Sequence, residues 1–219
     1  MAVSPRVRRF LVKAPVFAVC LSPAIYLAVA AGMNALGANP IKTITEETGT
    51  WTLRFLAVTL AVTPIRRWAG WNPIQRFRRM FGLFAFFYGT LHLLTYVWLD
   101  QFFAVPDIVK DIAKRPFITV GVAAFSLMVP LALTSTTGWI RRLGRRWQKL
   151  HRLVYVSAIL GVVHYWWLVK ADIRRPLAYG VVVGVLLAFR FYWVRIRSTV
   201  PQPSRVAAAA RTSHSAPRS

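Results

Sequence analysis

The sequence has 219 residues, of which 56% are hydrophobic and only 16% are charged, and its formal net charge is +23. Soluble domains carry about 25% charged residues, so this composition excludes a disordered chain and argues against a soluble globular domain. Basic chains often bind nucleic acid, but here the basic residues lie between long apolar runs, which favours a lipid bilayer as the partner and makes nucleic-acid binding unnecessary.

Six segments are apolar and long enough to be interpreted as membrane-spanning helices, which need roughly 17–25 residues. The first carries Cys20, the single cysteine, and is too long for the apolar part of a secretory signal. The second is short and carries Arg54. The segments are about 14–33, 50–65, 80–99, 117–134, 151–169 and 176–194. The sequence therefore predicts an all-α polytopic membrane protein, a six-transmembrane-helix bundle.

The chain divides into three predicted parts. Residues 1–13 form a basic cytoplasmic N-terminus, residues 14–196 the six-helix domain, and residues 197–219 a basic cytoplasmic tail. The tail is rich in Ser, Ala, Pro and Arg without a hydrophobic period, which predicts disorder. No internal repeat is apparent in the sequence.

The distribution of charge predicts the orientation, because Lys and Arg prefer the cytoplasmic side of short loops. Four basic residues precede the first helix, five lie in 66–79, six in 141–152 and six from Arg190 onward, and no acidic residue lies among them. All six acidic residues occupy the alternate loops. The pattern predicts N-in/C-in topology.

Three histidines lie in or beside predicted helices: His92 in the third, His151 and His164 in the fifth. His214 lies in the tail and is given no role. Ionisable residues at membrane depth are costly and usually functional. A neutral histidine bonded to a neighbouring helix is the structural alternative for any one of them.

Depth favours a functional role for two of these histidines. The third and fifth helices are predicted to run in the same direction, His92 lies 12 residues beyond Met80, and His164 lies 13 beyond His151. At 1.5 Å per residue, both are roughly 18–20 Å from the inner edge. Two imidazoles at one level on different helices are typical of axial ligands to a haem.

His151 lies further inward, where a second haem would complete an electron path, but its opposite ligand is not evident. Arg78, Arg79 and Met80 occupy the matching depth on the third helix. An arginine can pair with haem propionates, whereas methionine here is more often ordinary packing. His151 and His164 are about 140° apart around an ideal helix, so they do not form one stripe.

Other chemistries are less well supported. The roughly 20 Å between His151 and His164 prevents both from binding one zinc ion. A proton relay is weakened because the spans contain no carboxylates, and Ser-His-Asp, Walker-type and GxGxxG patterns are absent. No catalytic residue is assigned to this chain.

As a set, several motifs resemble the ferric reductase-like transmembrane family. The likeness covers about residues 15–196, and more narrowly it is to the haem-binding membrane subunits of bacterial periplasmic methionine sulfoxide reductase systems. The motifs are RRMFGL (78–83), YGTLH (88–92), GRRWQKLHRLVY (144–155), HYW (164–166), GANPIK (37–42) and LTST (133–136).

The resemblance implies haem b in a bacterial inner membrane, held by His92, His164 and, less firmly, His151. It implies electrons passing from the quinone pool to a periplasmic molybdopterin methionine sulfoxide reductase subunit, which repairs oxidised methionine, and FMN as a further cofactor. Larger eukaryotic relatives carry two histidines in the third helix, whereas this chain has one. One or two haems are therefore expected.

Two other functions stay open from the sequence. One is a stand-alone ferric reductase-like haem protein fed by a cytoplasmic flavin reductase, since the chain after the last span is too short for a nucleotide-binding domain. The other is a haem-free transporter, although paired Gly/Pro-broken spans are not seen. Arg54 is expected either to pair with a haem propionate or quinone, or to snorkel to the outer headgroups.

Overall fold

The computed structural model describes residues 5–169 and 172–199, and within these ranges the secondary structure is entirely helical. The predicted tail lies outside the described residues except for 197–199, which belong to the last helix. His214 also lies outside them. The all-α prediction is therefore confirmed for the described chain.

The described chain contains six long helices and five short helical segments. The long ones are α1 (Pro5–Gly32), α2 (Pro40–Trp68), α3 (Arg78–Leu94), α5 (Pro116–Leu133), α8 (Leu153–Leu168) and α9 (Arg174–Thr199). The short ones are a 3₁₀ helix η1 (Asn72–Phe77), a π-helical segment η2 (Thr95–Asp100), α4 (Val105–Lys114), α6 (Thr137–Leu143) and α7 (Arg145–Leu150). Each predicted span overlaps one long helix.

Four stretches of the described residues are long and apolar enough to cross a membrane, and they lie in α1, α3 with its flanking segments, α5 and α9. Helix α2 carries Arg54 near its middle and further charged residues toward both ends. Helix α8 has 16 residues, about 24 Å at 1.5 Å per residue, against a hydrocarbon core of about 30 Å. The count of six spans therefore stays a prediction.

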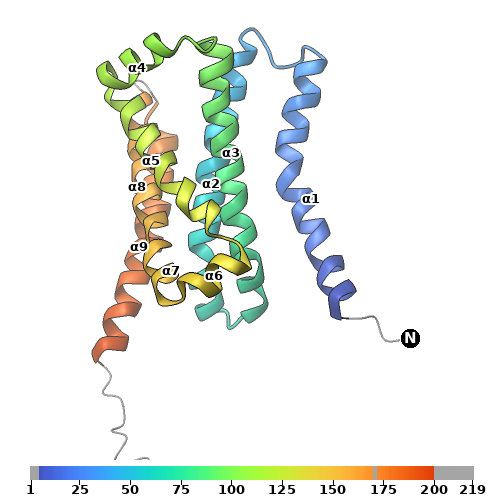
Figure 1. The fold of residues 1–219 in the computed structure, drawn as a ribbon, viewed down its shortest axis with the longest axis vertical. Coiled ribbons are helices and arrows are strands. Elements are labelled where there is room, and N and C mark those ends of the chain that lie inside the picture. Colours follow the sequence, from blue (N-terminus) through green and yellow to red (C-terminus); the bar gives the residue numbers. More distant parts are fainter. Residues whose placement is uncertain (1–4, 170–171, 200–219) are drawn as a thin grey trace, which may run out of the picture.

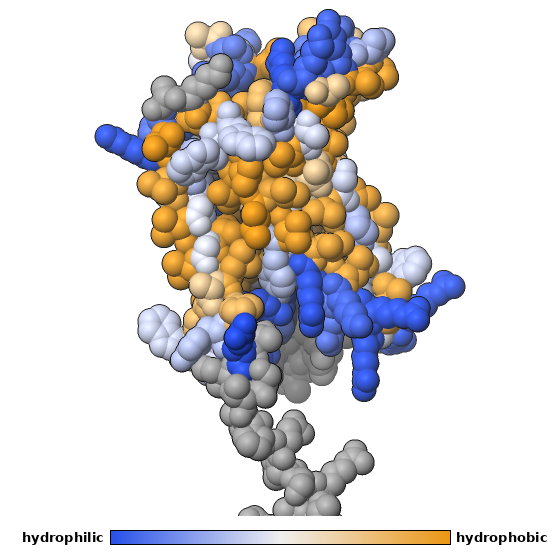
Figure 2. All heavy atoms as spheres, turned by 90° about the vertical axis from the view of Figure 1, so that its left-hand side faces the viewer, coloured by the Kyte–Doolittle hydropathy of each residue, from blue (hydrophilic) through white to orange (hydrophobic). Residues whose placement is uncertain are grey.

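The long helices form a bundle, with α1 standing to one side in Figure 1. The start of α1 and the end of α9 lie at the same end as α6 and α7, which we call the basic end, and α4 lies at the opposite end, the α4 end (Figure 1). Figure 2 shows an apolar belt between two hydrophilic ends. Apolar side chains such as Phe17, Val181 and Val185 are at least half exposed, as lipid-facing residues are.

Buried aromatic side chains join α2 and α3 at the core of the bundle. Phe55 of α2 stacks on Tyr88 and Phe84 of α3, with ring centroids 5.4 and 5.5 Å apart. The fully buried Tyr88 also holds α1: its hydroxyl donates to the Cys20 carbonyl at 2.9 Å and accepts from the Ala24 N–H at 3.1 Å. These two backbone groups would pair with each other in a regular helix.

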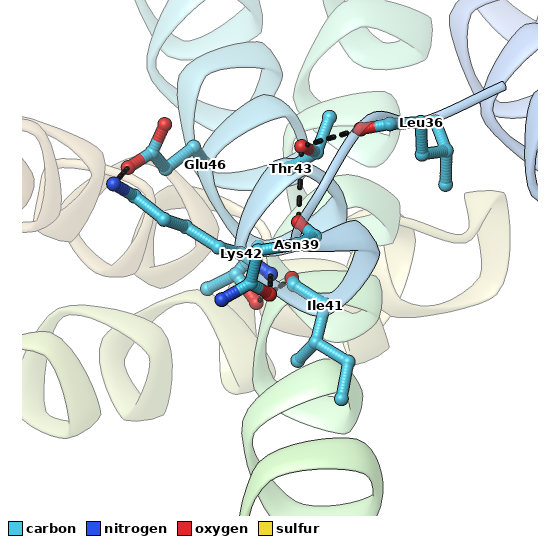
Figure 3. Close-up of polar contacts among 7 residues, drawn as sticks. Leu36, Asn39, Ile41, Lys42, Thr43 and Glu46 are labelled. Carbon is cyan, nitrogen blue, oxygen red and sulfur yellow. Dashed lines mark hydrogen bonds and ion pairs between the residues drawn. The ribbon is translucent and has the colours of Figure 1, made fainter.

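Helix α2 begins ten residues before the predicted span, because a strong start signal precedes it. The Asn39 side chain accepts from the Lys42 N–H at 3.0 Å (Figure 3). Pro40 occupies the first helical position, where its missing N–H costs nothing. The Thr43 hydroxyl bonds the carbonyls of Leu36 and Asn39 (Figure 3). The helix therefore extends beyond the predicted span of 50–65, which left out the first turns because they carry charged residues.

The predicted fifth helix also differs in detail. Gly144 adopts φ +50°, which favours glycine, and separates α6 from α7. His151 follows the last residue of α7, and α8 begins only at Leu153. His151 and His164 are therefore not on one continuous helix, so the predicted angle of about 140° between them does not apply.

Candidate haem site

His92 and His164 lie opposite each other near the α4 end of the bundle. His92 is in the last turn of α3 and His164 in the last turns of α8. Their ring centroids are 6.0 Å apart, with the planes inclined at 79°. A metal about 2 Å from one nitrogen of each ring would hold the two nitrogens about 4 Å apart. The distance from each nitrogen to the centre of its own ring accounts for the remainder of the centroid separation. The separation therefore suits two axial ligands of one iron.

Hydrogen bonds set the tautomer of both imidazoles. Nδ1 of His92 donates to the Thr45 carbonyl of α2 at 2.9 Å. Nδ1 of His164 donates to the Phe117 carbonyl of α5 at 2.6 Å. Because a carbonyl only accepts, Nδ1 carries the proton in each ring and Nε2 keeps its lone pair. This is the arrangement that metal-binding histidines use, with the second ring nitrogen held by an outer partner.

His151 lies apart from this pair, toward the basic end. Its ring stacks on Trp147, with centroids 3.8 Å apart and planes inclined at 27°, and its Nδ1 lies 3.1 Å from the Trp147 carbonyl. Its Nε2 is buried and has no hydrogen-bond partner. A buried ring nitrogen without a partner is unusual. Its lone pair could bind a metal ion or accept a hydrogen bond from a bound molecule.

The residues expected opposite His151 have other contacts. Arg79 donates to the Ser135 carbonyl at 3.3 Å, and Met80 packs against the hydrophobic core. A cavity of about 320 Å³ adjoins Arg79. The Trp147 indole donates to the Thr134 carbonyl, next to the cavity residue Ser135, at 2.9 Å. The cavity is lined by Arg79, Leu83, Ala132, Ser135, Thr136 and Thr137.

Arg54 and Cys20 have structural contacts. Nε of Arg54 donates to the Tyr179 hydroxyl of α9 at 3.2 Å, and its guanidinium lies 4.4 Å from the centre of the Trp51 ring. Arg54 thus links α2 to α9. Cys20 is buried in the hydrophobic core.

The donor set fits a haem with two axial ligands. Two facing imidazoles offer lone pairs from Nε2, and their outer nitrogens are satisfied by the protein. Within the described residues, no group of three or more His, Cys, Asp or Glu is placed to hold a metal ion. Sequence reasoning missed the Thr45 and Phe117 carbonyls and the stacking of Trp147 on His151, because backbone acceptors and ring contacts leave no residue-type signal.

Comparison with known proteins places the chain in a transmembrane family, in agreement with its helical structure. The family model described as "Ferric reductase like transmembrane component" matches residues 48–162. No solved structure matches the chain.

Three bacterial relatives carry the name "Protein-methionine-sulfoxide reductase heme-binding subunit MsrQ". The protein of Herminiimonas arsenicoxydans is 54% identical over 84% of this chain and 85% of its own length. Those of Azospira oryzae and Ralstonia nicotianae are 54% and 53% identical, over 89% and 84% of this chain and 84% and 86% of their own lengths. The chain therefore belongs to the ferric reductase-like transmembrane family, within its MsrQ branch.

Proposed function

We propose that this chain is a haem b electron-transfer subunit of the bacterial inner membrane, which passes electrons from the quinone pool to a periplasmic molybdopterin methionine sulfoxide reductase. The observation that carries the proposal is the His92–His164 pair: the ring centroids lie 6.0 Å apart, and both Nδ1 atoms are bonded to backbone carbonyls. A bound haem supplies one-electron redox chemistry. The chain's part is to hold and orient the two ligands.

The partner is proposed from the relatives' name, which describes a subunit of a methionine sulfoxide reductase. The position of the pair supports this role. His92 and His164 lie near the ends of α3 and α8 that face the α4 end, and the charge pattern predicts that this end is periplasmic. Electrons held there are close to a partner outside the membrane, where reduction of oxidised methionine would take place.

Electrons are proposed to enter at the basic end. His151, with its unpaired Nε2, is available there as a ligand of a second haem. The nearby cavity is lined by Arg79 and three hydroxyl-bearing residues. A guanidinium can hydrogen-bond a quinone carbonyl or a flavin phosphate, so this cavity is our candidate for the quinone or FMN that the family resemblance implies.

The decisive experiment is a dithionite-reduced-minus-oxidised spectrum of the purified protein, with pyridine haemochrome quantitation after expression with ample haem. We expect a b-type spectrum. A ratio near one haem per chain would leave His151 in another role, and a ratio near two would make it an axial ligand. Absence of haem would contradict the proposal and revive the transporter.

Electron delivery needs a separate test in membrane vesicles. We expect quinol to reduce the haem, and the added molybdopterin partner with a methionine sulfoxide substrate to reoxidise it. Replacing Arg79 with alanine should slow reduction by quinol severalfold and leave reoxidation by the partner unchanged. Equal rates of reduction in the variant and the wild type would remove Arg79 from the donor site.

A further inference from the structure

The two histidines are held in the same way by different helices. Thr45 and His92 are 47 residues apart, and so are Phe117 and His164. Adding 72 to the numbers of the first pair gives the second. Helices α2 and α3 thus hold one ligand as α5 and α8 hold the other.

Two glycines beside the histidines are related by the same displacement of 72 residues. A Cβ at Gly49 would lie 3.1 Å from Nδ1 of His92, and a Cβ at Gly121 would lie 2.7 Å from Nδ1 of His164. Gly121 is again 72 residues after Gly49, and each glycine is four residues after the carbonyl that its histidine bonds. Each imidazole edge therefore rests directly on the backbone of the facing helix.

A third pair of contacts crosses between the halves. A Cβ at Gly161 of α8 would lie 3.0 Å from Leu53 of α2, and a Cβ at Gly89 of α3 would lie 3.4 Å from Phe125 of α5. Gly161 is 72 residues after Gly89, and Phe125 is 72 residues after Leu53, so the two contacts are equivalent with the roles of the two helix pairs exchanged. This exchange is expected of two similar units facing each other across a pseudo-twofold axis.

The tertiary contacts thus relate two helix pairs between which the sequence shows no evident repeat. The α2–α3 and α5–α8 units share a Gly-x-x-His sequence, at 89–92 and 161–164, and a glycine on the facing helix. Most other positions differ, which is why the sequence alone hides the relation.

We propose that Gly49 and Gly121 are paired positioning residues for the two haem ligands, an inference that rests on the proposed function. In an α-helix the carbonyl of residue i already accepts from the N–H of residue i+4, and its second lone pair can accept from another donor. The Thr48 hydroxyl also lies 3.1 Å from the Thr45 carbonyl, but it is closer to the carbonyl of Ile44, at 2.7 Å. A side chain at position 49 or 121 would cover the second lone pair and displace the ring. Glycine therefore lets each imidazole donate from Nδ1, which orients Nε2 and raises its basicity.

Ordinary close packing is the competing explanation, because small residues let membrane helices approach each other. Gly161 separates the two explanations: a Cβ there would meet Leu53 at 3.0 Å, as tightly as at Gly49, but none of its close contacts is with a histidine. Gly82 of α3 serves as a mild control, since a Cβ there would make only an ordinary 3.8 Å contact with Thr59.

The test uses the full-length protein purified with haem, the variants Gly49→Ala, Gly121→Ala, Gly161→Ala and Gly82→Ala, the ferric EPR spectrum, and the rate of haem transfer to apomyoglobin. We expect Gly121→Ala to lose the low-spin bis-histidine signal or release haem at least tenfold faster. Gly49→Ala should retain haem with a shifted low-spin signal, because its contact is looser. Gly161→Ala and Gly82→Ala should keep the wild-type signal.

Two results would overturn the inference: wild-type EPR signals and transfer rates in both Gly49→Ala and Gly121→Ala, or a change in Gly161→Ala as large as that in Gly121→Ala. If Gly121→Ala is not recovered as folded protein, Gly49→Ala decides by the same criteria. Absence of haem from the wild type would instead contradict the proposed function, so the two failures are distinguishable.

Discussion

At the scale of single residues, the two proposed haem ligands lie together near the α4 end of the bundle. The ring centroids of His92 and His164 lie 6.0 Å apart, and the Nδ1 atom of each ring is bonded to a backbone carbonyl. His151 differs from these two histidines in its contacts. Its Nε2 is buried without a partner, and its ring is held by the stack on Trp147.

Replacing either member of the pair tests the ligand assignment. We expect His92→Ala or His164→Ala to abolish the absorbance of the haem between them, because one imidazole alone cannot complete a bis-histidine site. His214→Ala, in the tail, should keep the spectrum. The measurement is the reduced-minus-oxidised spectrum of each purified variant. Full retention in both His92→Ala and His164→Ala would contradict the assignment.

Pairs of helices, not single helices, determine how the two proposed haem ligands are held. Each histidine helix packs on a second helix that supplies a backbone carbonyl: α2 for α3, and α5 for α8. The cap at Asn39 sets where α2 begins and so where the Thr45 carbonyl lies. Helix α1 is attached to this arrangement by the hydroxyl of Tyr88, which bonds two backbone groups of α1.

Tyr88→Phe should therefore loosen α1. The hydroxyl makes two hydrogen bonds at a fully buried position, and removing a buried partner costs about 1–3 kcal/mol of unfolding free energy. We expect a lower thermal midpoint in detergent and faster proteolysis of α1. Tyr26→Phe, on the exposed face of α1, is the matched control and should change stability by less than about 0.5 kcal/mol. Equal midpoints for Tyr88→Phe and wild type would show that the hydroxyl does not stabilise α1.

At the scale of the whole molecule, the distribution of charge and apolar surface indicates how the protein is oriented in the membrane. An apolar belt separates two hydrophilic ends (Figure 2), and the described chain starts and finishes at the basic end (Figure 1). An excess of Lys and Arg at one end predicts that this end faces the cytoplasm. The proposed route of electrons, from the basic end to the α4 end, depends on that orientation.

Reporter fusions test the orientation directly. Alkaline phosphatase fused after residue 199 should be inactive, and green fluorescent protein at the same place should fluoresce, because the C-terminus is predicted to be cytoplasmic. Phosphatase inserted between η2 and α4 should be active. An active phosphatase at the C-terminus would reverse the proposed direction of electron transfer.

The sequence by itself determined the properties that depend on local composition and on regular helix geometry. Apolar runs predicted the long helices, because a chain in lipid must satisfy its backbone hydrogen bonds within each helix. Counting 1.5 Å per residue predicted His92 and His164 at one level, and the structure has their ring centroids 6.0 Å apart, although α8 begins at Leu153 and not at His151, from which the count was made. The early start of α2 and the break at His151 were missed, since caps and glycine turns override an apolar pattern.

Only the tertiary structure decided what each functional side chain touches. The carbonyls of Thr45 and Phe117 meet histidines 47 residues away, and any residue type supplies a carbonyl, so no pattern in the sequence marks them. The equivalence of the two helix pairs is likewise visible in contacts rather than in residue identities. Similar backbones can be built from different side chains, and glycine recurs in both halves only at a few close contacts: under the imidazoles, at Gly49 and Gly121, and between the halves, at Gly89 and Gly161.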